Sequence, residues 1–401
     1  MTKLEQLIQE LCSNGVEYRK MGELGTFYGG ITGKSKDDFK EGNAKFITYK
    51  NVYANPALQV DVPDRVRIGE KENQRTLEYG DIIFTGSSET PDECGISSVV
   101  TTKSDEKLYL NSFCFFFRLN DKNILLPDFS KHLFRSNGLR YQIGKTASGV
   151  TRFNVSKDRM KKVCIPIPPL EVQAEIVRIL DKFTELTTEL TTELTTELTN
   201  RKKQYEYYSR QLFADAKNTQ STTLEQISHN YDSQRKPVTS NKRTAGIYPY
   251  YGASGIVDYV DDYIFDGDYL LISEDGANLL ARNTPIAFSV SGKTWINNHA
   301  HILKFDNYHT RRYVEIYLNS IDLSPYITGA AQPKLNQKNL NKIEIPLPPI
   351  EEQQRIVAIL DRFDALCNDI SEGLPAEIEA RQKQYEYYRD KLLTFKELKK
   401  V

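Results

Sequence analysis

The sequence predicts an α+β protein in which two globular domains are joined by two long antiparallel helices of coiled-coil type, arranged as a pseudo-two-fold internal repeat. Three observations support this: a segment that occurs twice, apolar stripes at helical spacing after each copy's proline turn, and short aromatic and β-branched segments elsewhere. A chain of 401 residues is long enough for two cores. The predicted boundaries are 1–169 and 214–349 for the domains, and 170–213 and 350–401 for the helices.

The internal repeat is the most informative feature. Residues 165–186 (IPIPPLEVQAEIVRILDKFTEL) match 345–366 (IPLPPIEEQQRIVAILDRFDAL) at 13 of 22 positions. Residues 201–208 match 381–388 at 7 of 8 positions, and both matches have an offset of 180. Residues 148–163 and 328–343 keep this offset more loosely, whereas the segments before them diverge. The plan is therefore variable, constant, variable, constant.

Each constant part predicts a proline turn followed by a long helix. Prolines end the incoming strand and fix the entry to the helix. A helix over 170–213 would be about 65 Å long at ~1.5 Å per residue. In the second copy, Gly373 and Pro375 should break or kink the helix. The apolar stripes are expected to pack the two helices on each other, the alternative being that each helix packs on its own domain. The candidates for this packing and for partner docking are Leu180, Phe183, Leu190, Tyr205, Tyr208, Leu360, Phe363, Tyr385 and Tyr388.

Inside the first helix the unit TELT is written four times, at residues 184–199. Leucine recurs every four residues, so each unit adds about 6 Å of helix and turns the stripe by roughly 40°. Such monotony suits a spacer better than a site. The stretch is predicted to set the separation of the two domains.

The variable parts are expected to form α+β heads with their own cores. Strands are predicted at 80–84, 112–119, 267–272 and 300–305, from their aromatic and β-branched residues. Short helices are predicted at 127–137 and 310–319. A further amphipathic helix is expected at the N-terminus, where Leu4, Leu7, Ile8 and Leu11 share a face.

Composition narrows the functional class. Hydrophobic residues are 39% and charged residues 27%, with no apolar run near the ~20 residues of a membrane span and no signal peptide. The five cysteines are scattered and contain no C-x-x-C, which favours reduced cytoplasmic thiols over disulfides or zinc. The net charge is −1, but both helices are acidic. The remainder is therefore net +3, a weak indication of an anionic ligand.

Motifs for catalysis are weak. Residues 287–294 (AFSVSGKT) and 28–35 (YGGITGKS) imitate a phosphate loop but lack its first glycine, and the first is followed by a predicted strand. The histidines of HAH (299–301) have no obvious third ligand, so paired or loop-anchoring roles are expected and no metal site is predicted. Neither a nucleophile motif nor a methyl-donor loop is present. The chain is therefore predicted to be non-catalytic.

The heads instead carry polar and aromatic loops. Arg, Lys, Asn, Gln, Ser and Thr are the residue types that contact phosphates and base edges. The DNA-binding candidates are Tyr49, Lys50, Asn51, Arg152 and Asn154 in the first head, and Tyr251, Ser254, Asn278, Asn298 and Lys334 in the second. A coiled-coil scaffold whose heads bind protein partners is the alternative. A self-sufficient methylating enzyme is disfavoured.

Two diverged heads, each followed by I-P-[IL]-P-P, a long helix and K-Q-Y-E-Y-Y, resemble the specificity subunit of type I restriction-modification systems. The TELT array also matches this family, in which copy number sets spacing. The resemblance implies that each head is a target-recognition domain for one half of a bipartite double-stranded DNA target. It also implies docking of two methyltransferase subunits and of restriction subunits.

The same resemblance places the chemistry outside this chain. It implies adenine N6 methylation with S-adenosylmethionine in the methyltransferase, and ATP and Mg in the partner subunits, with no cofactor here. The expected location is the cytoplasm, without a membrane partner. One departure is the loop 150–154 (VTRFN), where the second half has AQPKLN. This leaves open whether both heads present the loop in the same way.

Overall fold

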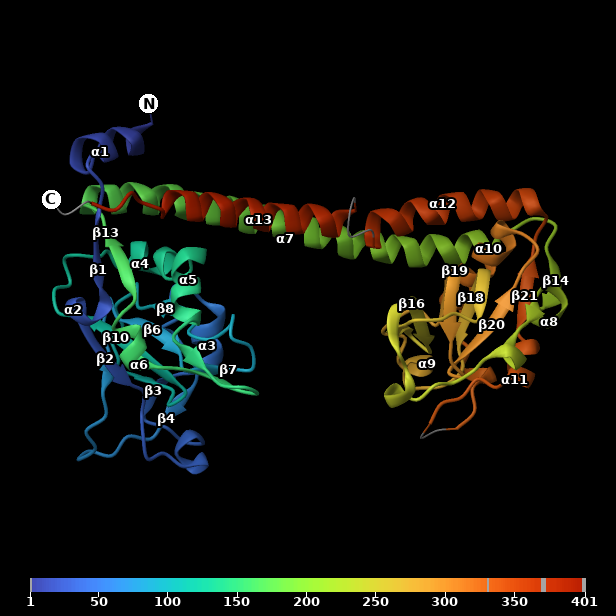
Figure 1. The fold of residues 1–401 in the computed structure, drawn as a ribbon, viewed down its shortest axis with the longest axis horizontal. Coiled ribbons are helices and arrows are strands. Elements are labelled where there is room, and N and C mark those ends of the chain that lie inside the picture. Colours follow the sequence, from blue (N-terminus) through green and yellow to red (C-terminus); the bar gives the residue numbers. More distant parts are fainter. Residues whose placement is uncertain (1, 330–331, 369–372, 399–401) are drawn as a thin grey trace. The chain divides into compact units, whose positions relative to one another are not determined.

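The computed structural model describes residues 2–329, 332–368 and 373–398. Two compact units divide the chain: Met1–Thr192 with Glu379–Val401, and Glu193–Ile378. Each contains one head with a β-sheet core and segments of the long helices (Figure 1).

The first unit has small sheets surrounded by short helices. Its helices are α1 (Lys3–Leu11), α2 (Met21–Leu24), α3 (Tyr49–Ala54), α4 (Pro127–Leu133), α5 (Asn137–Gly144) and α6 (Lys157–Met160), with the 3-10 helix η1 (Lys36–Phe39). Its strands are β1 (Glu17–Lys20), β2 (Gly25–Gly29), β3 (Ala44–Ile47), β4 (Arg65–Val66), β5 (Thr76–Leu77), β6 (Ile82–Thr85), β7 (Ser87–Ser88), β8 (Ser97–Val99), β9 (Leu108–Leu110), β10 (Cys114–Leu119), β11 (Ala147–Ser148), β12 (Phe153–Val155) and β13 (Cys164–Ile167).

Two four-stranded sheets, ordered β2-β10-β6-β8 and β4-β3-β9-β5, form most of this head. A three-stranded sheet β11-β12-β7 and the pair β1-β13 complete it. The strand and helix predictions for this head are confirmed by β6, β10 and α4, although α4 ends at Leu133 and a second helix follows. Helix α1 begins with a capping box, in which Thr2 and Glu5 each accept the other's backbone N–H.

The second unit contains one larger sheet, ordered β15-β20-β18-β19-β16-β17, and the pair β14-β21. Its strands are β14 (Gln220–Thr223), β15 (His229–Asn230), β16 (Ala245–Gly252), β17 (Gly255–Val260), β18 (Phe265–Ser273), β19 (Ala287–Ile296), β20 (Ala300–Lys304) and β21 (Glu344–Leu347). Its helices are α8 (Leu224–Ile227), α9 (Asn278–Ala281), α10 (Tyr308–Ser320), α11 (Gln337–Asn341) and α12 (Ile350–Asn368), with the 3-10 helices η2 (Asp232–Gln234), η3 (Ser240–Lys242) and η4 (Ser324–Tyr326). The strands and helix predicted here are confirmed by β18, β20 and α10.

The long helices are α7 (Leu170–Ala214), α12 and α13 (Leu374–Leu392). Helix α7 has 45 residues, which confirms the predicted first helix. In the second copy, Gly373 lies in a bend and α13 begins directly after it at Leu374, as predicted from Gly373 and Pro375. Helix α12 is described to Asn368, and residues 369–372 lie outside the described residues. In the part of the chain that the structure describes, no helix is both long enough and apolar enough to cross a membrane.

Both heads are attached to the helices by the same contacts. Gln173 donates to the Pro168 carbonyl at 2.8 Å, and Gln353 donates to the Pro348 carbonyl at 2.7 Å, so both pairs obey the offset of 180. The hydrogen bond between His132 and Asp181 likewise has its counterpart in that between Arg312 and Asp361, each at 2.7 Å. The strand that enters each helix is also paired alike, since Pro166 faces Tyr18 and Pro346 faces Ser221, although these two partner residues are not related by the offset of 180. The sequence repeat is therefore a repeat of the head-to-helix joint.

The apolar stripes divide between the two predicted kinds of packing. Leu180 is fully buried in the core of the first head, and Leu360 is fully buried in that of the second. Further along, the Phe183 ring stacks on Tyr388 at 5.7 Å, and Thr184 donates to the Tyr385 hydroxyl at 3.1 Å.

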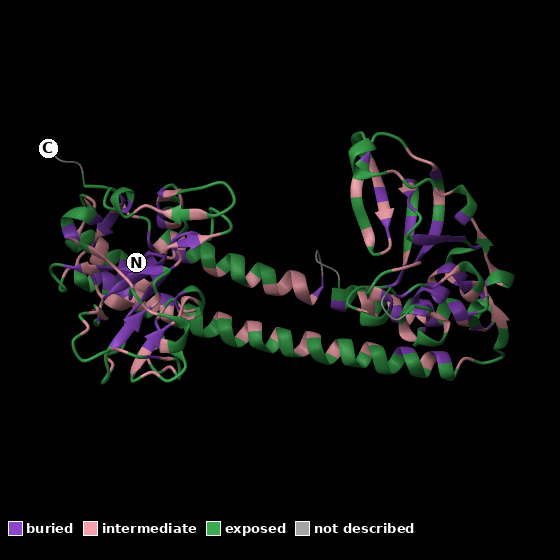
Figure 2. Ribbon diagram, turned by 90° about the horizontal axis from the view of Figure 1, so that it is seen from below, coloured by how far each residue is buried: buried purple, intermediate pink, exposed green. Residues whose placement is uncertain are grey.

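The second unit shows the corresponding helix contact. The ring of Tyr208 lies 6.0 Å from that of Phe363, while Tyr205 packs beside the head's core. Burial raises the pKa of the Tyr205 hydroxyl to about 12. In the first unit the paired positions rise along α7 as they fall along α13, which makes that pairing antiparallel. Leu190, inside the TELT array, is only half-buried, and Figure 2 shows the middle of α7 mainly exposed or intermediate.

Candidate nucleic-acid interface

The first head has an open hollow at the carboxyl ends of two strands. Strands β3 and β9 pair in parallel, so both end at the same edge of their sheet. Tyr49 follows β3 and Phe113 follows β9, and both line a hollow of about 810 Å³. Residues 87–89, Glu93 and 150–152 complete the lining. Polar loop residues and the aromatic side chains of Tyr49 and Phe113 therefore lie together at this edge of the sheet.

Ser87 connects two of the predicted residues in this hollow. The Tyr49 hydroxyl donates to the Ser87 carbonyl at 2.9 Å, while Arg152 donates to the Ser87 hydroxyl at 3.1 and 3.3 Å. The Arg152 guanidinium also lies 5.7 Å from the ring centre of Phe113, whose side chain is 58% exposed. Sequence reasoning missed Phe113, although an exposed aromatic residue beside a cation is a typical stacking surface for bases.

The carboxylate of Glu93 fixes one wall of this hollow. It accepts hydrogen bonds from the hydroxyls of Tyr53, Thr90 and Ser88. These bonds, that of Tyr53 first, lower the pKa of Glu93, so the group stays ionised. Since Tyr53 lies on α3 and Ser88 on β7, the carboxylate ties α3 to the loop that follows β7.

The remaining candidates of the first head differ in availability. Lys50 is exposed on α3, and Asn154 is exposed on β12. Asn51, in contrast, uses its side-chain amide inside the fold. It donates to the Gln59 carbonyl at 2.8 Å, and its oxygen accepts from the Gln59 backbone and from Asn55. The structure thus brings Tyr49 and Arg152 together but gives Asn51 a loop-fastening role.

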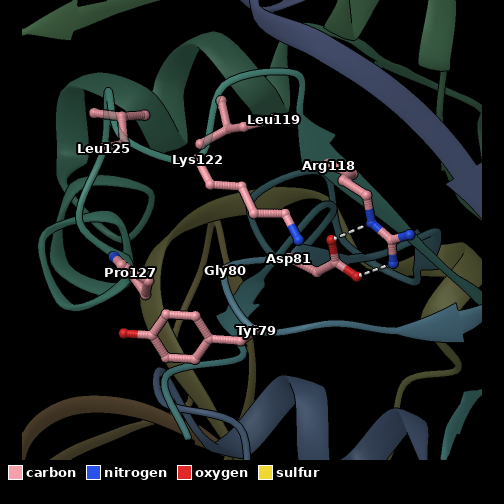
Figure 3. Close-up of a pocket in the computed structure, with 8 residues that line it drawn as sticks. All are labelled: Tyr79, Gly80, Asp81, Arg118, Leu119, Lys122, Leu125 and Pro127. Carbon is pink, nitrogen blue, oxygen red and sulfur yellow. Dashed lines mark hydrogen bonds and ion pairs between the residues drawn. The ribbon is translucent and has the colours of Figure 1, made fainter. Parts of the chain in front are cut away.

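A second, smaller pocket in this head is structural. Its volume is about 20 Å³, room for roughly one water. Figure 3 shows Arg118 pointing at Asp81, which is 1% exposed. The guanidinium donates to both carboxylate oxygens, at 2.8 and 2.6 Å, and burial raises the pKa of the Asp81 carboxyl. Because Arg118 and Asp81 bond to each other, they are not available to a ligand. The open hollow is therefore the better candidate for a DNA-binding site.

The candidates of the second head are less clustered. Ser254 is exposed at the turn between β16 and β17, and Asn298 is exposed between β19 and β20. Tyr251 is half-buried, with its ring 6.1 Å from that of Phe288, and burial raises its pKa. Asn278 bonds to both backbone groups of Thr284 and so closes the turn around α9.

Lys334 belongs to a cluster of charged side chains in the second head. Its ammonium is 3.1 Å from Glu274, which is also paired with Arg235. The buried His301 has its Nδ1 2.5 Å from an Asp232 oxygen and its Nε2 2.7 Å from the Leu335 carbonyl. Both ring nitrogens therefore lie within hydrogen-bond distance of an oxygen atom. This cluster binds the segment before β21 to the sheet.

The two segments that resemble a phosphate loop and the histidine pair at 299–301 have structural roles. Gly292 and Lys293 lie within strand β19, so residues 287–294 do not form a loop at a helix N-terminus. Lys34, in the other imitation, is paired with Glu72. His299 bonds to Asp275 at 2.9 Å, as expected of a loop-anchoring histidine. Among the described residues, no group of three or more His, Cys, Asp or Glu side chains is placed to hold a metal ion.

The loop before each constant part has the same backbone register in the two heads. Ser148 pairs with Asn154 in the first head, and Thr328 pairs with Lys334 in the second, again 180 residues apart. The two ends of this loop are therefore paired alike in both heads, although their residues differ. The offset of 180 places Gln332 where the first head has Arg152, and Gln332 is exposed. Gln332 is therefore a further DNA-binding candidate. Applying the offset to the sequence of this loop would have found it.

Comparison with known proteins gives a consistent result. Residues 13–200 and 217–380 match the family model for the type I restriction modification DNA specificity domain. A putative type I restriction enzyme specificity subunit of Haemophilus influenzae, S.HindORF215P, is 40% identical over 182 residues, 44% of this chain and 47% of the relative. The EcoR124I/EcoR124II specificity subunit of Escherichia coli is 36% identical over 267 residues, 60% of this chain and 65% of the relative. This chain thus spans about half and just under two thirds of the length of these two relatives.

Solved structures agree at the level of the fold. A chain from work on complex assembly and conformational transition of the type I R-M system has a TM-score of 0.68 at 16% identity, covering 94% of this chain and 97% of that one. The HsdS subunit from Thermoanaerobacter tengcongensis has a TM-score of 0.53 at 19% identity, covering 96% of each chain. Because the two matches of the family model together cover most of its length, the chain belongs to the type I restriction modification DNA specificity family.

Proposed function

We propose that this chain is the sequence-recognition subunit of a type I restriction-modification complex. Each head binds one half of a bipartite double-stranded DNA target. The helix pair sets the distance between the half-sites and docks two methyltransferase subunits, with restriction subunits joining them. The chain acts in the cytoplasm.

The repeated head-to-helix joint carries this proposal. Gln173 and Gln353, and the hydrogen bonds of Asp181 and Asp361, hold both heads by the same contacts. The loops that carry the DNA-binding candidates nevertheless differ in sequence between the two heads. A constant frame with two different sets of loops is what reading two different half-sites requires.

The chemistry of the first rim favours DNA over a protein partner. Phe113 is exposed with the Arg152 guanidinium beside it, and Lys50 is exposed nearby on α3. Stacking surfaces flanked by cations suit bases and phosphates, whereas protein interfaces are depleted of lysine at their centre. The scaffold with protein-binding heads is therefore the weaker alternative.

Catalysis is assigned to the partners. S-adenosylmethionine belongs to the methyltransferase, and ATP and Mg belong to the partner subunits, so no cofactor is proposed for this chain. The purified chain should transfer no methyl group to DNA and should not cut it. Methyl transfer by the chain alone, purified away from any methyltransferase, would contradict this assignment.

Binding to duplex DNA tests the proposal directly. The chain is co-purified with the methyltransferase encoded beside it, and its motif is taken from the methylome of the host. Fluorescence anisotropy should show tighter binding to a duplex with this motif than to a scrambled duplex. Affinity should also fall steeply with salt, because protein cations displace counterions from phosphates. Equal affinity for both duplexes would contradict DNA recognition and would favour the protein-binding scaffold.

A further inference from the structure

We propose that Phe113 is a wedge that enters the base stack of the half-site read by the first head and parts two neighbouring base pairs. The inference rests on the proposed function and refines it. It assigns to the open hollow of the first head the opening of the duplex at one step, beyond contact with an undistorted groove. Phe113 is then a specificity-determining residue that bonds to no base edge.

Phe113 lies between two hollows of the first head. It lines the hollow of about 810 Å³ described above and also a neighbouring hollow of about 660 Å³. The other lining residues of the neighbouring hollow include 31–36, Phe39 and Phe46, none of which lines the first hollow. Because the two hollows share Phe113, its exposed side chain separates them. A wedge needs room on both sides, since the two base pairs that it parts lie against opposite faces of its ring.

Exposed apolar side chains at this hollow indicate that the ligand presents an apolar surface. Val150 lines the same hollow as Phe113 and is 92% exposed. Side chains of this kind gain free energy when a ligand removes them from water. In double-stranded DNA the apolar surfaces are the small thymine methyl group and the broad base faces, which neighbouring pairs cover. A phenyl ring reaches a base face only where the stack opens.

The backbone holds Phe113 in place for insertion. Its amide donates to the side-chain oxygen of Asn111 at 2.8 Å, and its carbonyl accepts from the Gly86 amide at 2.7 Å. A Cβ at Gly86 would lie 2.7 Å from that carbonyl oxygen, so glycine allows this close approach of the two chain segments. An aromatic side chain with few rotatable bonds also loses little entropy on insertion. Phe113 is therefore preorganised as a wedge.

Positive charge is present at both hollows. The Arg152 guanidinium lies 5.7 Å from the ring centre of Phe113 in the first hollow, and Lys36 is exposed at the neighbouring one. Neither cation has a carboxylate partner among the described residues. Both are suited to the phosphates that flank an opened step. The carboxylates of Glu89 and Glu93, which also line the first hollow, suit base amino groups instead.

A wedge makes the stacking strength of the DNA part of its recognition. Pyrimidine–purine steps are kinked and unstacked more readily than other steps. We therefore expect the step that Phe113 enters to be of this kind. The first head would then select against stiff sequences at a position where it forms no hydrogen bond to a base.

Base analogues that fluoresce more brightly when unstacked test the proposal in the complete chain, co-purified with its methyltransferase. Each base pair of the target duplex is labelled in turn, with 2-aminopurine in place of adenine or pyrrolocytosine in place of cytosine. The methylated pairs are left out, because methyltransferases flip their own target base. The unaltered complex should brighten the analogue at one step of the half-site read by the first head, which exchange of the second head identifies.

Two substitutions of Phe113 separate the wedge from a general surface role. Phe113→Ala should abolish this brightening and weaken binding to the target duplex roughly ten- to a hundredfold. It should leave the slope of log affinity against log salt unchanged, because no charge is lost. Phe113→Leu should keep most of the brightening and of the affinity, because leucine also serves as a wedge in DNA-bending proteins.

Tyr141→Ala is the matched control in the first head. Tyr141 is 65% exposed and has the Lys145 ammonium 4.1 Å from its ring centre, but it lines neither hollow. Its loss should leave the brightening, the affinity and the salt slope unchanged. Thermal unfolding of each variant confirms that it is folded. Signals in the half-site of the second head should not depend on Phe113.

Three results would overturn the proposal. One is a target duplex that brightens at no pair outside the methylated ones, which would leave Phe113 at most a contact with a base edge such as the thymine methyl group. Another is brightening that persists in the Phe113→Ala variant. The third is unchanged affinity of folded Phe113→Ala, which would leave the side chain to a protein contact. Failure of the proposed function is distinct, because the unaltered complex would then show no preference for its own motif.

Discussion

Two neighbouring residues of the first head, Lys50 and Asn51, show how one short stretch can serve both folding and binding. Lys50 is exposed, whereas Asn51 fastens residues 55–59 through its amide. Sequence composition marked both as polar loop residues. The two roles are distinguished only by the structure, in which the chain turns so that Gln59 lies beside the Asn51 side chain.

Alanine at these two positions should give opposite results. Asn51→Ala removes three hydrogen bonds and should lower the free energy of unfolding by about 1–3 kcal/mol, at ~1 kcal/mol for each bond. Lys50→Ala should leave stability within about 0.5 kcal/mol and weaken DNA binding. Urea unfolding and anisotropy measure the two effects. A stable Asn51→Ala variant with an altered methylated motif would restore Asn51 as a base reader.

His301 and Asp232 form a buried hydrogen-bonded pair in the second head. Their side chains are 1% and 5% exposed. Burial alone would raise the pKa of Asp232, but its bonds to His301 and to the Ile302 amide and the charge of Arg235 outweigh this and lower it. An aspartate with a lowered folded-state pKa stabilises the fold above its usual value of 3.8. That contribution is lost as the pH falls through the folded-state pKa.

Two substitutions at Asp232 separate charge from hydrogen bonding. Asp232→Ala leaves the imidazole without its partner and should cost about 3–5 kcal/mol. Asp232→Asn should cost less, because its amide can donate to a neutral imidazole, and should remove the acid-dependent loss carried by this carboxylate. Trp295, the single tryptophan of the chain, lies on β19 in the same head, so its fluorescence reports this unfolding. An acid dependence that is identical in the unaltered chain and in the Asp232→Asn variant would show that this pair contributes nothing.

At the scale of elements, the spacing of apolar residues in the sequence predicted most of the helices and strands named below. The 45-residue helix α7, the break before α13 and the central strands β6, β10, β18 and β20 follow from apolar spacing and proline chemistry. The division of each apolar stripe between its own head and its twin helix could not be predicted. Leu180 and Phe183 differ by less than one turn, yet one is buried in the head and the other stacks on Tyr388. That difference depends on the position of the sheet.

The candidate site was less predictable than the fold for the same reason. Tyr49 and Arg152 are 103 residues apart in sequence and meet only because both reach Ser87. Phe113 is apolar and would be expected in a core, but it follows the end of β9 and is exposed there. Composition can mark a loop as binding, whereas tertiary pairing decides which side chains face outward.

The TELT array tests the role of α7. Deleting one four-residue unit should shorten this helix by about 6 Å and rotate its C-terminal part by roughly 40°. With about 3.4 Å per base pair, and with partial compensation at the break between α12 and α13, the gap between half-sites should shrink by one or two base pairs. Motif mapping by long-read methylation in variants with three, four and five units measures the gap. An unchanged gap would make the array a tolerant surface helix, and altered half-site bases would mean that it touches recognition.

At the scale of the whole molecule, the chain is two variable heads on one repeated frame. The joints at Gln173 and Gln353 are alike, and the helices α7, α12 and α13 carry the constant sequence. Such a design makes each head exchangeable without loss of the frame. Under the proposed function, target choice and partner docking are assigned to different parts of the chain.

Exchange of one head tests this most directly. Residues 214–349 are replaced by the second head of another family member, and the methylome of the host is sequenced with and without the exchange. The account predicts that one half of the bipartite motif changes to that of the donor, while the other half and the presence of methylation are kept. A motif changed in both halves, or unchanged in both by a folded and active chimera, would contradict the claim that each head reads its own half-site.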